Sequence, residues 1–179
     1  MFGKGCLMRG AVFAAVLLLF AGCGRGTVTV SPDADCYRTA TAVMDACGES
    51  LFSGSALLWA GADSPDERIE EGYAVLYFGD GLEDIDMERI TDYAIAEAAF
   101  GEASQFGVIR LRSPEDAAVV TEWIKARSVR VSGTFTSYKP EEKQIADGWE
   151  IRTAGDFVYY CASCDNEAVF RVMEDSLSG

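Results

Sequence analysis

The sequence predicts an α+β domain, a small and mostly antiparallel four-stranded sheet packed with helices. Two pairs of short apolar segments, separated by turn residues, have the pattern of β-hairpins. Two Ser-Pro-acid-acid segments, 64–67 and 113–116, are typical of helix starts. The resulting order is helix, helix, strand, strand, helix, strand, strand, helix, which favours α+β with antiparallel pairing.

The first expected helix follows Asp33, where apolar residues recur at steps of four, three and four. These residues, which form one face of a helix, are Cys36, Ala40, Val43 and Cys47. Gly48 is a plausible stop. Residues 49–63 contain an apolar stretch at 56–60 that the pattern does not assign.

A second helix is expected over residues 64–79. Ser64 can cap free amides, Pro65 tolerates the first turn, and the following acids suit the positive end of the helix dipole. Residues 73–78 alone could also form a buried strand, but the upstream cap favours a helix. Residues 80–92 form an acidic connection or a short helical turn.

Residues 93–100 and 106–112 are predicted to form an antiparallel pair, because the second segment alternates as a half-buried strand does. The next helix starts at Ser113. Its buried face is expected to consist of Val120, Trp123, Ile124 and Arg127. Basic residues near its end, namely Lys125, Arg127 and Arg130, suit the negative end of the dipole.

After a polar loop through Pro140, residues 149–153 and 156–162 predict a second hairpin around a glycine-containing turn. A last helix is expected to be capped by Asp165 or Asn166. Its inward residues are Ala168, Val169, Val172 and Met173.

The start of the chain has the pattern of a lipoprotein export signal. Lys4 and Arg9 precede a small and apolar run at 11–20, and Leu-Phe-Ala-Gly leads to Cys23. We therefore expect a signal peptide over residues 1–22 and a lipidated Cys23, with a tether over 23–32 and one domain over 33–179. An ordinary secretory signal is the alternative. A retained anchor is disfavoured because a spanning helix needs ~20 apolar residues.

This interpretation predicts a lipid-anchored protein on the extracytoplasmic face of the cell membrane, with the membrane as one partner. The formal net charge of the chain is −14. Such a charge repels phosphate backbones, so nucleic acid is not an expected partner. The sequence contains no histidine, which removes the commonest general base and every Ser-His or Cys-His arrangement.

Cys161 and Cys164 lie between an expected strand and a helix start, a setting that suits either a structural disulfide or thiol–disulfide exchange. Together with Cys36 and Cys47 they could also form a four-thiolate metal site, although the spacing of the first pair does not fit one. In a continuous helix, the α-carbons of Cys36 and Cys47 would be ~16 Å apart, whereas a disulfide needs ~7 Å or less. Several pairings remain open.

Other candidate sites are weaker. The acidic residues at 80–88 do not have the glycine and glutamate that an EF-hand loop requires. Glu97 and Glu102 could serve as an acid–base pair, but no sequence feature distinguishes them from other acids. The aromatic side chains of Trp123, Trp149, Tyr159 and Tyr160 suit a core better than a ligand platform. We expect no metal and no cofactor.

Residues 106–157 carry a family resemblance. A strand of the type Phe-Gly-Val-Ile-Arg-Leu leads into the Ser113 helix, with Arg127 near its end. Phe135, Tyr138-Lys139-Pro140-Glu141, Ile145 and the 149–158 hairpin follow. This pattern resembles the DUF4358 lipoproteins of Gram-positive, clostridial-type bacteria over about residues 90–175. The resemblance implies lipid anchoring and an α+β fold. The family has no assigned activity, and its pattern does not include the four cysteines.

Three functions are compatible with these features. The favoured hypothesis is a non-enzymatic surface module that binds a protein or an envelope component. The alternative is an extracytoplasmic thiol–disulfide oxidoreductase that uses Cys161 and Cys164. A solute-capturing lipoprotein is disfavoured, because the chain is short for a two-lobed fold.

Overall fold

The computed structural model describes residues 28–82, 84–136 and 139–179. Its centre is one antiparallel sheet in the order β1-β2-β3-β5-β4. The strands are β1 (Ala56–Trp59), β2 (Ile90–Glu97), β3 (Gln105–Leu111), β4 (Glu150–Ala154) and β5 (Phe157–Ala162). The α+β class and the antiparallel pairing are therefore confirmed. The expected number of four strands was wrong, because the unassigned apolar stretch forms β1 on the edge beside β2.

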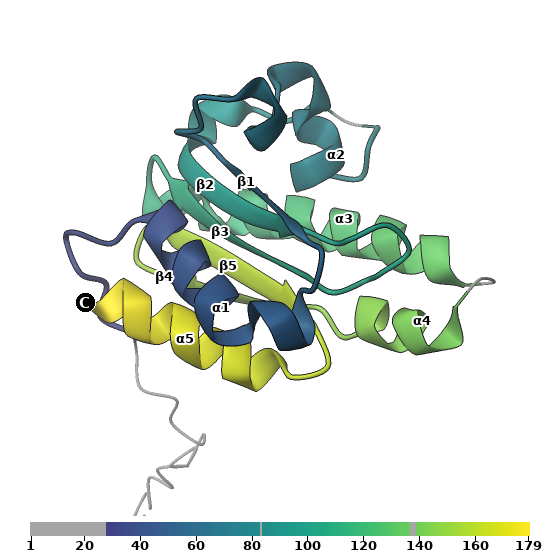
Figure 1. Ribbon diagram of the computed structural model, residues 1–179. Helices are drawn as coiled ribbons and strands as arrows, with labels where there is room; N and C mark the ends of the chain where they lie inside the picture. Colours follow the sequence, from purple (N-terminus) through teal and green to yellow (C-terminus); the bar gives the residue numbers. More distant parts are fainter. Residues whose placement is uncertain (1–27, 83, 137–138) are drawn as a thin grey trace, which may run out of the picture.

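Helices cover both faces of this sheet (Figure 1). The α-helices are α1 (Cys36–Leu51), α2 (Ala74–Phe78), α3 (Ala117–Phe135), α4 (Pro140–Asp147) and α5 (Asn166–Ser178). Helices α1 and α5 pack together on one face, and α3 lies across the other face with α2 near one end (Figure 1). The described residues thus form three layers.

The alternation of side chains along each strand supplies the two cores. In β3, Phe106 and Val108 belong to the core beneath α1 and α5, whereas Ile109 belongs to the core beneath α3. In β5, Tyr159 and Tyr160 divide in the same way. Because successive strand residues point to opposite faces, a central strand buried on both sides is apolar throughout instead of alternating with polar residues.

The expectation of one helix over residues 64–79 was wrong. The segment forms two short 3-10 turns, Pro65–Glu67 and Glu71–Tyr73, and only then helix α2. Between the turns, the amide of Ile69 donates to the Tyr93 hydroxyl of β2 at 2.9 Å. In a continuous helix this amide would donate to a backbone carbonyl of the preceding turn instead. Ser64 also makes no side-chain cap. A tertiary contact therefore interrupts a locally plausible helix.

The polar loop that was expected to run through Pro140 was wrong in part. Helix α3 continues to Phe135, and helix α4 begins at Pro140. Pro140 occupies the first turn of α4 with Glu141 and Glu142 behind it, which repeats the proline-and-acid helix start. The apolar side chain of Ile145 packs with Phe135 of α3 in a small third cluster.

The membrane-related expectations concern the start of the chain. The signal peptide over residues 1–22, Cys23 and the tether up to residue 27 lie outside the described residues. Among the helices in the described part of the chain, none is both long enough and apolar enough to cross a bilayer.

A close fit in the sheet is between Gly107 of β3 and Tyr160 of β5, which are direct partners in the register. A Cβ atom on residue 107 would lie 2.5 Å from Cε1 of the Tyr160 ring. Because Gly107 has no side chain, the Tyr160 ring can lie against the neighbouring strand β3. The same ring stacks on Trp149, with 4.9 Å between ring centroids.

We predict that Gly107→Ala lowers the free energy of unfolding by about 1–3 kcal/mol, the usual cost of overpacking a core. The matched control is Gly133→Ala in α3, where an added Cβ meets no atom within 4 Å. That control should stabilise the protein by up to ~1 kcal/mol through helix propensity. Chemical denaturation of the two variants measures both values, and equal stabilities would contradict the prediction.

Candidate functional site

A surface cleft of about 480 Å³ lies between the α2 segment, α3 and the adjoining ends of β2 and β3. Its polar lining includes Glu97, Glu102, Gln105, Arg127 and Arg130. Its aromatic and aliphatic lining includes Tyr73, Leu76, Tyr77, Val131 and Phe135. We refer to this set of residues as the arginine cleft.

Arg127 is the deepest charged group of the cleft, with only 4% of the residue exposed. Its Nη1 donates to the backbone carbonyl of Tyr77, and its Nη2 donates to Gln105 Oε1 at 2.7 Å. Its Nε is buried and has no hydrogen-bond partner in the part of the chain that the structure describes. Within the described residues no carboxylate forms an ion pair with Arg127, so neutral oxygens are its only hydrogen-bond acceptors.

Aromatic rings give Arg127 partial compensation. Its Cζ lies 5.7 Å from the centroid of the Tyr77 ring and 5.9 Å from that of Trp149. Such cation–π contacts are weaker than a buried ion pair. Beside them, the Tyr160 hydroxyl and Trp149 Nε1 are buried without partners among the described residues. Burial raises the pKa of Tyr160, so its hydroxyl remains a neutral donor.

Arg130 places a second cation on the same side of α3, one turn further along. Its Nη2 donates to the Leu76 carbonyl, and its Nε is buried without a partner. Burial lowers the pKa of Arg130, and the nearby charge of Arg127 lowers it further, while Asp80 opposes the change. Two neighbouring guanidinium groups therefore repel each other here, and a bound anion would relieve that repulsion.

The two carboxylates named from the sequence both line the cleft, but they have separate partners. Glu97 accepts a hydrogen bond from the Tyr77 hydroxyl at 3.3 Å. Glu102 forms an ion pair with Lys139 at 3.3 Å. Burial raises the pKa of Tyr77, and Glu97 adds to the increase, so the phenol stays protonated as a donor. Glu97 and Glu102 therefore do not interact as an acid–base pair in this structure.

Sequence reasoning placed Arg127 on the buried face of its helix, which is confirmed. It also placed Arg127 near the end of that helix, where a cation suits the negative end of the dipole, and this was wrong because α3 continues to Phe135. The signal was its spacing: Val120, Ile124 and Arg127 recur at steps of four and three on the buried face. A cation on an apolar face needs a specific partner or ligand.

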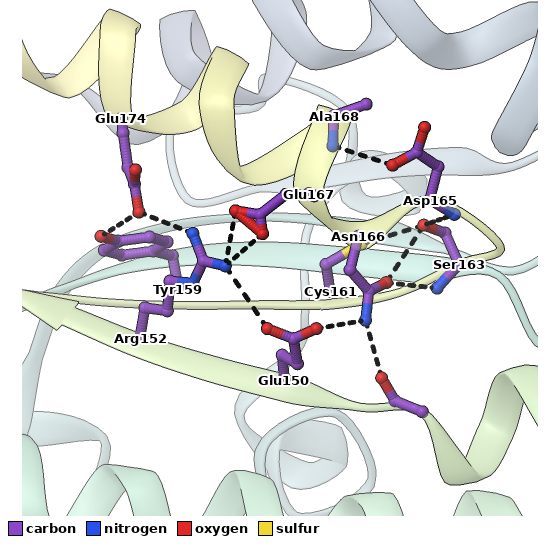
Figure 2. Close-up of polar contacts among 11 residues, drawn as sticks. Glu150, Arg152, Tyr159, Cys161, Ser163, Asp165, Asn166, Glu167, Ala168 and Glu174 are labelled. Atoms are coloured by element: carbon purple, nitrogen blue, oxygen red, sulfur yellow. Dashed lines mark hydrogen bonds and ion pairs between the residues drawn. The ribbon is translucent and has the colours of Figure 1, made fainter. Parts of the chain in front are cut away.

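A contrasting charged cluster joins β4 to α5 (Figure 2). Arg152 donates to Glu174 at 2.9 Å and to Glu167 at 3.1 Å, and it also contacts Glu150. Its guanidinium covers the ring of Phe170, with Cζ 3.7 Å from the centroid. Because several carboxylates surround Arg152, this cluster is internally compensated, and we interpret it as structural.

The loop after β5 is held by hydrogen bonds to side chains of its own residues (Figure 2). Asn166 Oδ1 accepts from the amide of Ser163 at 2.8 Å, and Asp165 caps α5 by accepting from the amide of Ala168 at 3.1 Å. Cys164 lies between β5 and the start of α5, as expected, whereas Cys161 lies within β5.

The four cysteines of the domain are free thiols in the structure. Cys36 and Cys47 belong to one continuous helix, as the spacing predicted, and therefore lie too far apart along it to form a disulfide with each other. Cys47 and Cys161 share the core beneath α1 and α5, whereas Cys164 is exposed. The expected structural disulfide is thus not present.

The environment of Cys161 opposes nucleophilic chemistry. Burial raises the pKa of Cys161 to about 12, although a hydrogen bond with Ser163 acts in the opposite direction. Burial also raises the pKa of Cys36 and Cys47. Since the thiolate is the reactive form, these three thiols stay protonated near neutral pH and react slowly as nucleophiles.

A second hollow of about 440 Å³ contains Cys164 and Glu142. Glu142 accepts from the Ala103 amide at 2.6 Å and so ties α4 to the β2–β3 connection. Burial raises the pKa of Glu142, and the neighbouring Glu102 contributes to the increase. The carboxyl group therefore has a structural role, because it accepts a hydrogen bond from the backbone.

The metal alternatives find no geometric support in the structure. Across residues 28–82, 84–136 and 139–179, no three His, Cys, Asp or Glu side chains gather in a way that could hold a metal ion. The four cysteines, which a thiolate cage would require together, are divided between the core and the surface.

Comparison with known proteins gives one match. A family model described as a domain of unknown function, DUF4358, matches residues 81–163. This match supports the resemblance and spans β2 to β5, including Glu97, Gln105, Arg127 and Arg130 of the arginine cleft. It does not include α1, α2 or α5. No curated protein and no solved structure matches the chain.

We predict that a maleimide reagent modifies Cys164 well before Cys36, Cys47 and Cys161 in the native protein at neutral pH. The reason is that Cys164 is exposed, whereas the others are buried with raised pKa values. Peptide mass spectrometry after timed labelling measures the order. Denaturation before labelling is the control, and it should make all four react. Early native labelling of Cys161 would contradict the prediction.

Proposed function

We propose that this protein is a non-enzymatic binding module, held on the extracytoplasmic face of the cell membrane by lipid on Cys23. Its arginine cleft binds a small organic carboxylate. The observation that carries the proposal is Arg127, a buried cation whose hydrogen bonds among the described residues go only to neutral oxygens. Arg130 beside it adds a second positive charge to the cleft.

The energetics of burial support a ligand. Moving a guanidinium group out of water is costly unless a counter-ion or a full set of hydrogen bonds compensates it. Arg127 has two of its nitrogen atoms engaged and one buried without a partner. A carboxylate offers two oxygens in the geometry that a guanidinium fork recognises. Binding would therefore complete an interaction that the protein leaves incomplete.

The shape of the cleft supports an organic anion over a bare inorganic one. Leu76, Val131 and Phe135 line it together with two tyrosines, so an apolar body can be buried beside the charge. Small-molecule sites commonly combine an apolar lining with a few placed polar groups. A volume of about 480 Å³ suits a small ligand.

The chemistry of the cleft favours binding over catalysis. Its described lining contains neither serine nor cysteine, and the hydroxyl of its threonine, Thr134, donates to the Arg130 carbonyl at 3.2 Å. The sequence contains no histidine to activate a nucleophile. The oxidoreductase alternative gains no support from the thiols, because Cys161 is buried with a pKa raised to about 12. We therefore place the function in the cleft and not at the cysteines.

We predict that hexanoate, used as a probe, binds saturably to the purified protein and shifts the amide signals of Tyr77 and Gln105 in NMR spectra. Arg127→Met and Arg130→Met should each weaken binding roughly tenfold or more, because each removes a charge-assisted hydrogen bond. Arg112→Met, which removes an exposed arginine, is the matched control. Circular dichroism checks that each variant is folded. Absence of saturable binding to the native protein by both hexanoate and its α-amino analogue, L-norleucine, would overturn the proposal.

The anchor has its own test. We predict that the protein expressed in a Gram-positive host partitions into the detergent phase of Triton X-114, whereas Cys23→Ser partitions into the aqueous phase. Lipid on the cysteine would supply the apolar anchor that the serine variant lacks. Partition of both forms into the aqueous phase would contradict lipid anchoring while leaving the binding proposal intact.

A further inference from the structure

The arginine cleft contains a negative charge opposite its positive ones, and this pairing restricts the ligand. Glu97 ends β2, and the antiparallel register places it across from Gln105, one step beyond the Ala96–Phe106 pair. Gln105 in turn accepts the hydrogen bond from Arg127 at 2.7 Å. Directly opposite residues on neighbouring antiparallel strands have Cβ atoms ~5 Å apart. Glu97 and Arg127 therefore flank Gln105 inside one cavity.

Tyr77 holds both charges in place. Its backbone carbonyl accepts from Arg127, and its hydroxyl donates to Glu97 at 3.3 Å. Glu97 is half-buried and lines the cleft, and within the described residues no cationic side chain forms an ion pair with it. The cleft thus has a cationic side and an anionic side, and neither Arg127 nor Glu97 forms an ion pair among the described residues.

This arrangement disfavours dianions. A phosphate or a dicarboxylate that reached Arg127 and Arg130 would bring its remaining negative charge towards Glu97 and Glu102. Like charges within a partly buried site repel strongly. A molecule that carries an ammonium group next to its carboxylate would instead satisfy both sides.

On the basis of the proposed function, we propose that the ligand of the arginine cleft is a free α-amino acid with an apolar side chain. Its carboxylate binds Arg127 and Arg130, its ammonium group binds Glu97, and its side chain packs against Leu76, Val131 and Phe135. Charge-assisted contacts at both ends give recognition of the zwitterion, which neither a simple acid nor a simple amine can reproduce.

The test compares three matched probes with the purified full-length chain in mild detergent, namely hexanoate, L-norleucine and pentylamine. Norleucine is hexanoate with an added α-ammonium group, and pentylamine keeps only the ammonium. We expect norleucine to bind at least roughly tenfold more tightly than hexanoate, because one charge-assisted contact is added. Pentylamine should bind most weakly, since the two arginines repel it.

The variant Glu97→Gln isolates the inferred contact. It should abolish the advantage of norleucine, so that norleucine and hexanoate bind with similar affinity, while hexanoate binding is kept or improved. Glu122→Gln is the control on α3, because Glu122 is exposed and pairs with Lys125 at 2.7 Å. This control should preserve the norleucine advantage in full.

The possible results separate the two proposals. Equal or tighter binding of hexanoate by the native protein overturns the amino-acid inference and leaves the carboxylate proposal standing. A norleucine advantage that survives in Glu97→Gln also overturns the inference, since another group must then hold the ammonium. Failure of both hexanoate and norleucine to bind overturns both proposals.

Discussion

Strands β3 and β5 are buried on both faces, and this constraint determines how the rest of the domain is arranged. Alternate residues of each strand supply two separate cores, one beneath α1 and α5 and one beneath α3. Burial of apolar surface on each side drives the helical layers onto the sheet. The pairing of Gly107 with the Tyr160 ring shows how closely the two central strands fit.

The three-layer arrangement also decides where charge can be compensated. Arg152 lies near the edge of the sheet, where Glu167 and Glu174 of α5 reach it. Arg127 instead projects from the core-facing side of α3, where its partners among the described residues are two neutral oxygens and two aromatic rings. Arginine therefore has a structural role at position 152, where carboxylates pair with it. At position 127 its charge has no paired carboxylate among the described residues. This contrast is the physical basis of the proposed binding function.

Local sequence patterns predicted much of the fold. The spacing of Cys36, Ala40, Val43 and Cys47 predicted α1, and the two hairpins predicted β2 with β3 and β4 with β5. The misses have specific causes. Strand β1 has only four residues and gains its stability from pairing with β2, a contact that no local pattern contains. The segment after Ser64 lost its helical continuity because the Tyr93 hydroxyl takes the amide of Ile69.

The sequence by itself determined the secondary-structure class, the antiparallel pairing and the position of Arg127 on the buried face of a helix. It also determined that no histidine takes part in any chemistry of this chain. Only the tertiary structure decided that Glu97, Gln105, Tyr77 and the two arginines meet in one cleft. The reason is that these residues come from a strand end, a neighbouring strand, a short helix and a long helix, and periodicity describes each element alone. Their juxtaposition depends on how the elements pack around a sheet buried on both sides.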